Sequence, residues 1–533
     1  MIVYFIYKDN SYTVKLLIDY AKENHIILQI NVKIKEGFPF LYAIKKNNIE
    51  IIKLFFEYAK ENSITLDINK SDNDGNNSFM LAIISGNIKM VQLLMEYAKE
   101  KNILLELNKS NKQKSYPLLH AVKCCNIEIV EFIVKYAKEY GIILDINKND
   151  NDGYNSLEYA LKNSSIEIVK ILTEYALENN IILEINKEDN NSNFPLLYAI
   201  ESEQIDIIQL LLGYAKASNT NLEIQKSNKQ KNYPLLLAIK KNNIKIVKLL
   251  IEYAKENKII LDLNQTNSNG NSPFLYAISN DNISLVKLLI EYAKENKIIL
   301  EINQMNNKGN YPLFYAISYY NTDMARLLIG YARENKIKLE INRKSYQNNY
   351  PILLAVYSNI IIIVKLLIEY AIDNQIILEV NDKNHHGDYP ILVATSNNNN
   401  EMVKLLIDYA KKCSINLVLN EHNHQGDYPI LIASINSNTV IVQLLMKHAF
   451  QNNITLEINK KNGKRKYPLL YATDNNNKEI FKSLIKYLCK NNLTLELDEK
   501  YYYVTSLKNS KKYLYMYYFY YLYYFLLVWF SLI

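Results

Sequence analysis

Apolar and polar residues alternate along residues 233–264 in a pattern that predicts two helices joined by a turn. Pro234 marks the start of the first helix, because proline fixes φ and the first helical position does not need its missing amide proton. A polar break from Lys240 to Asn243 follows, where asparagine can adopt a left-handed conformation and cap the next helix. From Ile244 onwards the apolar residues are three and four positions apart, which predicts a longer helix with one buried face.

The same pattern recurs along the chain with a constant period. The alanine of the first helix occurs twelve times, always 39 residues apart. These alanines are Ala43, Ala82, Ala121, Ala160, Ala199, Ala238, Ala277, Ala316, Ala355, Ala394, Ala433 and Ala472. All ten prolines stand four residues before one of them, and Ser78 and Ser156 fill the two remaining places. One helical hairpin cannot bury its apolar face alone, so copies at a fixed period are expected to stack into a solenoid.

Short polar linkers join each pair of helices to the next. Six of them carry a glycine three residues before the proline or serine that begins the next repeat. The six are Gly75, Gly153, Gly270, Gly309, Gly387 and Gly426. A glycine at the tip of a hairpin allows a positive φ. The predicted fold is therefore all-α, a helical-repeat solenoid with short hairpin linkers.

The repeat resembles the ankyrin repeat. The family motif T-P-L-H-x-A appears as YPLLLA at 233–238, as YPLFYA at 311–316 and as YPLLHA at 116–121. The V-x-L-L of the second helix follows at the family spacing. The resemblance covers about residues 1–500, and it implies an ankyrin-like array that binds another protein on its concave face.

The chain departs from the family in its period and in two motif residues. The usual period is about 33 residues, and we interpret KENKIILDLN at 255–264 as a lengthened outer helix with a longer exit segment. The family's threonine is mostly tyrosine or phenylalanine here, and its histidine is mostly leucine or tyrosine, so that only His120 remains. We therefore expect stacking to depend more on apolar contact and less on the hydrogen bonds that threonine and histidine supply in the family.

Three segments of the chain differ in pattern. Residues 1–31 carry a second-helix pattern without the hairpin that should precede it, and we interpret them as a truncated N-terminal repeat. Residues 32–500 hold the twelve repeats with no linker to mark a boundary, which predicts one array despite the length of 533 residues. Residues 501–533 form a tyrosine-rich hydrophobic tail.

The tail has more than one interpretation. Its last 21 residues, Tyr513 to Ile533, carry no charge and as a helix would be about 30 Å long, enough to cross a bilayer. Lys508, Lys511 and Lys512 would then lie on the cytoplasmic side. However, eight of the 21 residues are tyrosine, which prefers the membrane interface. The alternatives are a hydrophobic end that packs on the last repeat and translated noncoding sequence.

Charge and composition indicate no nucleic-acid partner. The net charge of +7 comes from 62 basic and 55 acidic residues, which is weak for a chain of this length. Basic clusters such as Lys226, Lys229 and Lys231 lie in linkers several repeats apart, so they form no continuous stripe for a phosphate backbone. The abundant asparagine, lysine, isoleucine and tyrosine are all encoded by A/T-rich triplets and therefore identify no partner.

The residues of catalytic, cofactor and metal sites do not occur at their known spacings. The four cysteines are Cys124, Cys125, Cys413 and Cys489. They form no C-x-x-C pair and no disulfide framework, which predicts a reduced, intracellular and cytoplasmic chain. His385 and His424 occupy the same linker position in adjacent repeats, but no carboxylate or cysteine accompanies them, so we predict no metal site. Phosphate-loop, nucleophile-elbow and zinc-protease motifs are absent, which predicts no enzyme, no cofactor and no small-molecule substrate.

Two functional classes follow: a scaffold for an unidentified protein partner, and the same scaffold tethered to a membrane through Tyr513 to Ile533. The stack needs the positions that stay constant among repeats, so a partner can be discriminated only by the variable ones. The two residues after the first-helix core vary, and the resemblance places them on the concave side. We predict that Lys240, Lys241, Tyr319 and Tyr357 contact the partner. The alternative is that they are only the solvated ends of short helices.

Truncation tests the tail. If Tyr513 to Ile533 anchors the protein, a chain ending at Lys500 should be soluble, whereas the full chain should partition into membranes and resist carbonate extraction. The driving force is the transfer of an uncharged helix into lipid. Full-length protein that stays in the soluble fraction without detergent would refute the anchor.

Overall fold

The computed structural model describes residues 2–33, 38–491 and 493. These residues form 26 α-helices and no strand, apart from one isolated bridge between Ser71 and Asn77. The chain divides into two compact units, Met1–Glu301 with α1 to α16 and Ile302–Ile533 with α17 to α26. The predicted all-α class is confirmed. The predicted tail at residues 501–533 lies outside the described residues.

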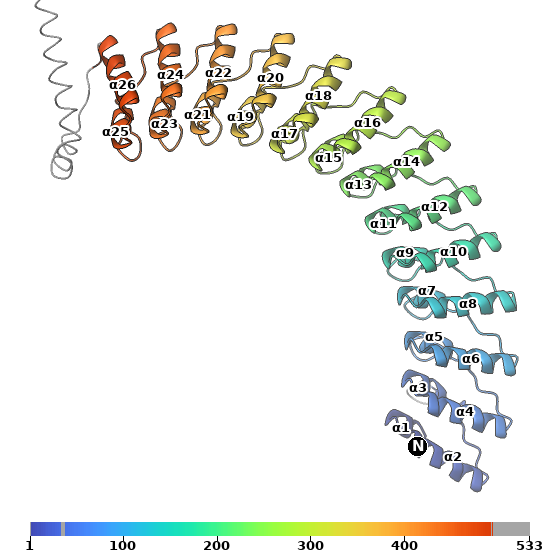
Figure 1. The fold of residues 1–533 in the computed structure, drawn as a ribbon. Helices are drawn as coiled ribbons and strands as arrows, with labels where there is room; N and C mark the ends of the chain where they lie inside the picture. The colour runs from blue at the N-terminus through green and yellow to red at the C-terminus, as the bar shows by residue number, and fades with distance from the viewer. Residues whose placement is uncertain (1, 34–37, 492, 494–533) are drawn as a thin grey trace, which may run out of the picture. The chain divides into compact units, whose positions relative to one another are not determined.

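Short and long helices alternate along the chain, and in each unit the short helices lie on one side and the long helices on the other (Figure 1). The short first helices have six or seven residues. They are α1 (Ile2–Tyr7), α3 (Pro39–Lys45), α5 (Ser78–Ile84), α7 (Pro117–Lys123), α9 (Ser156–Lys162), α11 (Pro195–Glu201), α13 (Pro234–Lys240), α15 (Pro273–Ser279), α17 (Pro312–Ser318), α19 (Pro351–Tyr357), α21 (Pro390–Ser396), α23 (Pro429–Ile435) and α25 (Pro468–Asp474).

The long second helices have 13 or 14 residues. They are α2 (Ser11–Glu23), α4 (Ile49–Glu61), α6 (Ile88–Glu100), α8 (Ile127–Tyr140), α10 (Ile166–Glu178), α12 (Ile205–Ala217), α14 (Ile244–Glu256), α16 (Ile283–Glu295), α18 (Thr322–Glu334), α20 (Ile361–Asp373), α22 (Asn400–Lys412), α24 (Thr439–Gln451) and α26 (Lys478–Lys490).

The local signals of the sequence determine where these helices begin. Ten short helices begin at a proline, and α5 and α9 begin at Ser78 and Ser156, as predicted. Between α13 and α14 the chain turns at Asn242, whose φ is 59°. Asn243 then caps α14, because its side-chain oxygen accepts a hydrogen bond from the backbone N–H of Ile246 at 3.3 Å. The six linker glycines have φ values between 75° and 90°, which confirms the predicted hairpin tips.

The residues that lengthen the repeat extend the second helix and its exit segment. Helix α14 includes Lys255 and Glu256, and the chain leaves it through Lys258, whose φ is 57°. In the exit segment the side chains of Leu261 and Leu263 are buried. The interpretation of KENKIILDLN as a longer helix and exit is therefore confirmed, and the exit adds apolar contacts to the core.

Tyrosine replaces the family's threonine and links neighbouring repeats. The ring of Tyr350 is fully buried, and its hydroxyl donates to the backbone carbonyl of Asp382 in the next repeat at 2.7 Å. Tyr389 and Tyr428 make the same bond to Glu421 at 2.7 Å and to Lys460 at 2.6 Å. Burial raises the pKa of each of these tyrosines, so the hydroxyls stay protonated donors.

The position assigned above to the family's histidine, which His120 occupies, is in fact the unspecified fifth position of the motif, directly before the alanine. Tyrosine at this position holds the hairpin tip of its own repeat. The hydroxyl of Tyr159 donates to the carboxylate of Asp150 at 2.7 Å, and that of Tyr276 accepts from the Asn267 amide at 3.1 Å. Burial, together with the bond to Asp150, raises the pKa of Tyr159 to about 12. These bonds lie within one repeat, whereas the tyrosine hydroxyls at the threonine position bond the next repeat, so hydrogen bonds between repeats persist without the family's threonine.

A third tyrosine lies on most of the long helices and bonds the exit segment of the preceding repeat. The hydroxyl of Tyr214 accepts the backbone N–H of Leu183 at 2.8 Å and donates to the carbonyl of Ile181 at 2.9 Å. We call this series of bonds the tyrosine ladder. The tyrosines whose hydroxyls accept a backbone N–H in it are Tyr58, Tyr97, Tyr136, Tyr175, Tyr214, Tyr253, Tyr292, Tyr370, Tyr409 and Tyr487. Each hydroxyl thus satisfies a backbone group of the neighbouring repeat.

The asparagine that closes each repeat makes a second ladder along the exit segments. The side-chain amide of Asn264 donates to the carbonyl of Ile299 at 2.8 Å and accepts from the N–H of Glu301 at 3.1 Å. Asn108 makes the same pair of bonds with Ile143 and Asp145. The exit segments are therefore joined both through tyrosine and through asparagine.

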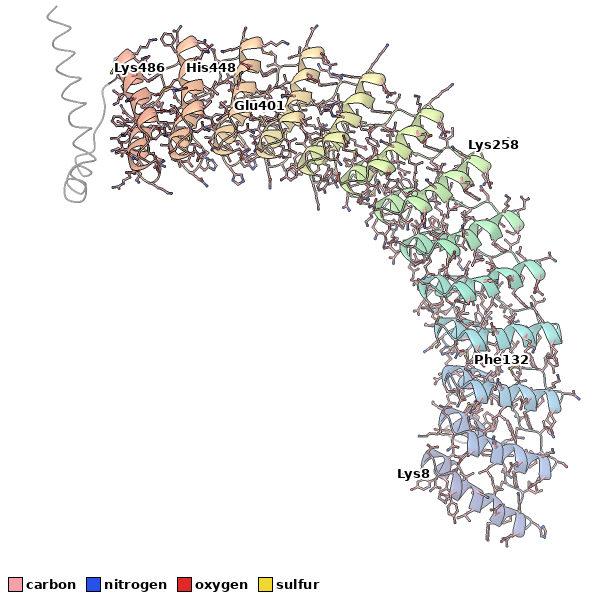
Figure 2. The ribbon with its side chains drawn as sticks, viewed as in Figure 1. Lys8, Phe132, Lys258, Glu401, His448 and Lys486 are labelled. Carbon is pink, nitrogen blue, oxygen red and sulfur yellow. The ribbon has the colours of Figure 1, made fainter. Side chains whose placement is uncertain are left out.

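His448 interrupts the tyrosine ladder in the second unit (Figure 2). It stands on α24 where the preceding long helix has Tyr409, and its ring is 1% exposed. In the preceding repeat the backbone N–H of Leu378 donates to the Tyr409 hydroxyl at 2.9 Å. The corresponding N–H of Leu417 has no acceptor among the described residues. Burial, and to a smaller extent the charge of Lys411, lower the pKa of His448. Because this N–H lacks its acceptor, we expect this repeat interface to be weaker than its neighbours.

The twelve alanines provide a direct test of the stack. Each is at most 1% exposed, so a larger side chain has no free volume there. Replacing Ala238 by leucine should overpack the first-helix layer, destabilise the array by about 1 to 3 kcal/mol and expose adjacent repeats to proteolysis. A variant that melts like the parent protein would contradict this assignment.

His448→Tyr should stabilise the second unit. The new hydroxyl can accept the Leu417 N–H, which is worth about 0.5 to 1.5 kcal/mol at neutral pH. Because the folded-state pKa of His448 is lowered, the parent protein loses stability as the pH falls below about 6.5, where the unfolded histidine takes up a proton. Thermal melts at pH 7.5 and 5.5, with hydrogen exchange in α22 and α24, measure both effects.

The matched control for this change is the reverse substitution in the preceding repeat. Tyr409→His should lower stability, and should lower it further in acid, because it creates a second interruption of the same kind. If the parent and His448→Tyr proteins lose the same free energy of unfolding between pH 7.5 and 5.5, His448 is not the cause of the acid sensitivity.

Candidate binding surface

In each unit, the exposed residues of the short helices and of the hairpin tips before them lie on one side, which we call the first-helix surface (Figure 1). One asparagine or aspartate side chain holds most of the tips in place, such as Asn228 and Asp189. In the tip before α13, the side-chain oxygen of Asn228 accepts the N–H groups of Gln230 at 3.1 Å and of Asn232 at 3.0 Å. The tip backbone is therefore fixed by its own sequence before any partner binds.

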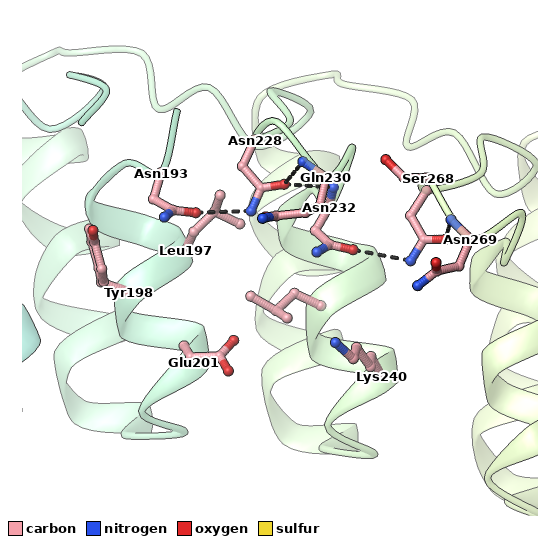
Figure 3. A pocket seen from close by; sticks show the side chains of 12 residues that line it. Asn193, Leu197, Tyr198, Glu201, Asn228, Gln230, Asn232, Lys240, Ser268 and Asn269 are labelled. Carbon is pink, nitrogen blue, oxygen red and sulfur yellow. Dashed lines mark hydrogen bonds between the residues drawn. The ribbon is translucent and has the colours of Figure 1, made fainter. Parts of the chain in front are cut away.

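Neighbouring tips are bonded to one another. The amide of Asn228 donates to the side-chain oxygen of Asn193 at 2.9 Å, and the amide of Asn267 donates to that of Asn232 at 3.2 Å (Figure 3). The N–H of Ser268 donates to the carbonyl of Gln230 at 3.0 Å. Successive tips in the first unit are thus held at a constant spacing.

A hollow of about 420 Å³ lies between α11 and α13 beneath these tips. Its walls are Leu197 and Tyr198 on α11, Leu237 on α13 and the amides of the tips, while Glu201 and Lys240 stand at the helix ends (Figure 3). The amide groups both donate and accept hydrogen bonds. The side-chain oxygens of Asn193 and Asn232 already accept from the amides of Asn228 and Asn267.

The structure gives the two predicted lysines different roles. Lys240 is exposed, lines the hollow and makes no ion pair with any described residue. Lys241 instead pairs with Glu201 at 3.2 Å and with Glu203 at 3.9 Å, both in the preceding repeat. Lys240 is available to a partner, whereas Lys241 also contributes to stacking.

The two predicted tyrosines lie in the second unit, in consecutive repeats. Tyr319 follows α17, is 44% exposed and stacks on Tyr315 with 5.9 Å between ring centroids. Tyr357 ends α19 and is 39% exposed, while its hydroxyl donates to the Asp388 carboxylate and accepts from the Asn384 amide. Burial, followed by the bond to Asp388, raises the pKa of Tyr357. Both rings present one face to solvent, although neighbouring groups restrain them.

Sequence reasoning missed the hollow and its amide lining. The sequence does contain a signal for this lining, because asparagine recurs after 39 residues. Asn193 and Asn232 form one such pair, and Asn228 and Asn267 form another. The abundance of asparagine identified no partner, because A/T-rich coding explains it equally well.

The described residues contain no group of three or more histidine, cysteine, aspartate or glutamate side chains able to hold a metal ion. A search of the same residues for a helix long and apolar enough to cross a membrane found none. The predicted anchor at Tyr513 to Ile533 falls outside the residues that were searched.

A family model described as ankyrin repeats in three copies matches residues 2–104, 100–182, 219–299, 296–377 and 391–495. Among solved structures, the chain is similar to the ankyrin repeat domain of Bcl-3, a member of the IkappaB protein family. The two are 18% identical with a TM-score of 0.34, and the alignment covers 48% of this chain and 99% of that one. No curated protein matches the sequence.

Proposed function

Because this chain belongs to the ankyrin-repeat family, whose members are generally non-catalytic interaction modules, we propose that it is a scaffold that binds a partner protein on its first-helix surface. In the family this surface is the concave face. The contact residues that we propose are Lys240, Lys241, Tyr319 and Tyr357.

One observation carries the proposal: the hollow between α11 and α13 has at its rim an exposed cation that forms no ion pair with any described residue. Lys240 has no carboxylate partner there, while Lys241, one residue away, is paired with Glu201. A cation at the rim of a pre-formed hollow can pair with a carboxylate of the partner and steer its approach.

The chemistry of the hollow favours a protein over a small ligand. Small-molecule sites are mostly apolar and bury most of the ligand surface. Here the amides of Asn193, Asn232 and Gln230 alternate with only two leucines. Amide side chains match the donors and acceptors of a polypeptide backbone.

A membrane-tethered form of the scaffold is the second candidate. It is supported by the 21 uncharged residues from Tyr513 to Ile533, preceded by Lys508, Lys511 and Lys512. Tethering would place the same binding surface next to a cytoplasmic membrane surface.

The binding test uses a partner isolated by affinity capture on residues 1–500. Lys240→Ala and Tyr319→Ala should each weaken its binding by about 1 to 2 kcal/mol with little change in melting temperature. Lys241→Ala and Tyr357→Ala should lower affinity and stability together, because both side chains also bond neighbouring repeats. Titration calorimetry paired with thermal melts separates these two classes.

Lys248 and Lys287, exposed on the long helices α14 and α16, are the matched control positions. Their alanine variants remove the same charge from the other side of the repeats. Equal loss of affinity in these controls, or full affinity in the Lys240→Ala and Tyr319→Ala variants, would move the binding site off the first-helix surface.

A further inference from the structure

Helix α9 carries a buried glutamate in the core of the first unit. Glu158 is the third residue of α9 and is 0% exposed. At this position of the short helix, the other eleven 39-residue copies have leucine, methionine or phenylalanine. These residues are Leu41, Met80, Leu119, Leu197, Leu236, Leu275, Phe314, Leu353, Leu392, Leu431 and Leu470. A carboxyl group therefore stands where the stack otherwise places an apolar side chain.

One carboxyl oxygen of Glu158 is bonded and the other is not. Oε2 accepts the backbone N–H of Asn155 at 2.7 Å, and the side-chain oxygen of Asn155 accepts the N–H of Glu158 at 3.0 Å. Oε1 is buried and has no hydrogen-bond partner among the described residues. An ionised carboxylate costs much more free energy to bury than a neutral carboxyl group. Oε1 is therefore the atom at which a proton lowers the cost of burial.

The start of the helix does not require this glutamate. Helix α5 also begins at a serine, Ser78, and Asn77 caps it by accepting the N–H of Met80 at 2.9 Å. Met80 stands at the position of Glu158 and is 2% exposed. The cap that replaces proline is thus complete without a carboxylate, and the chain itself contains a neutral version of the same helix.

Glu158 faces the following repeat. Helix α9 packs against α7, α10 and α11, and the charged groups that act on Glu158 are Lys162 on α9 and Lys187 and Asp189 before α11. Lys187 already pairs with Glu184 at 2.8 Å. The other titratable side chains of these helices and of the tips before α9 and α11 are His120, Lys123, Asp150, Asp152, Tyr154, Tyr159, Glu167, Lys170, Glu174, Tyr175, Glu178, Glu188, Tyr198 and Glu201.

Burial raises the pKa of Glu158 to about 6, although the bond from Asn155 and the charge of Lys187 act in the opposite direction. An unfolded glutamate has a pKa of about 4.3. Because the folded-state pKa is the higher one, the folded protein binds this proton more tightly than the unfolded chain does. The ionised Glu158 therefore destabilises the array above about pH 6, and this cost disappears as the pH falls from about 6 to about 4.

We propose that Glu158 is a pH-sensitive joint in the array, which couples the repeats of α9 and α11 weakly when it is ionised and firmly when Oε1 carries a proton. Leu197, the residue of α11 that corresponds to Glu158, lines the hollow between α11 and α13. The joint thus lies one repeat away from that hollow, and acid holds the α11 wall more firmly. The joint works within one chain and needs no partner.

Hydrogen exchange in α9 and α11 of the full-length chain tests this joint, after correction for the intrinsic effect of pH on exchange. Between pH 7.5 and 5.5 the opening constant of these helices should fall about fourfold more in the parent protein than in Glu158→Gln. Glutamine keeps an oxygen for the Asn155 N–H but cannot ionise. The comparison cancels the contribution of His120, whose pKa burial lowers and which therefore acts in the opposite direction.

Two exchanges between α9 and α5 are the matched controls. Glu158→Met gives α9 the neutral arrangement of α5 and should behave like Glu158→Gln, whereas Met80→Glu should transfer the pH dependence to α5 and α7. The proposal is overturned if the parent and Glu158→Gln respond equally to pH, or if acid loosens α9 and α11 in the parent relative to that variant. A folded Met80→Glu protein whose α5 and α7 show no added pH dependence would also overturn it.

Discussion

Most exit segments bury a backbone amide whose acceptor belongs to the next repeat. At Leu183, a buried residue, the acceptor is the hydroxyl of Tyr214, 31 positions further along the chain. Without the Tyr214 hydroxyl this N–H would be unpaired in the packed array, at a cost of about 1 to 3 kcal/mol. Apolar stacking and backbone satisfaction thus require the same neighbour, which couples each repeat to the next one.

Much of the fold could be predicted because its signals are local. Pro234 and Asn243 set helix boundaries through their own backbone and side-chain preferences, and the constant period showed that the pairs stack. The polar ladders could not be predicted in the same way. Their bonds join residues about one period apart, such as Asn264 and Ile299, and depend on how one exit segment lies over another.

The candidate site shows the same division. Lys240 and Lys241 are adjacent and chemically identical, yet only Lys241 meets a carboxylate, because Glu201 ends the short helix of the preceding repeat. A single repeat contains no information on this pairing. The variable positions were a reasonable place to expect partner contacts, but variability alone did not distinguish a side chain that faces solvent from one that bonds the neighbouring repeat.

The tyrosine ladder also restricts how the length of such a chain can change in evolution. When one whole 39-residue unit is gained or lost, each exit segment again lies next to a long helix in the same register. The amide that corresponds to Leu183 then meets a hydroxyl that corresponds to Tyr214, so every donor has an acceptor. An insertion of any other length moves the hydroxyl away from the amide that it serves. Duplication and deletion of entire units are therefore the changes that selection on folding tolerates, and the twelve alanines in strict register are what that constraint leaves in the sequence.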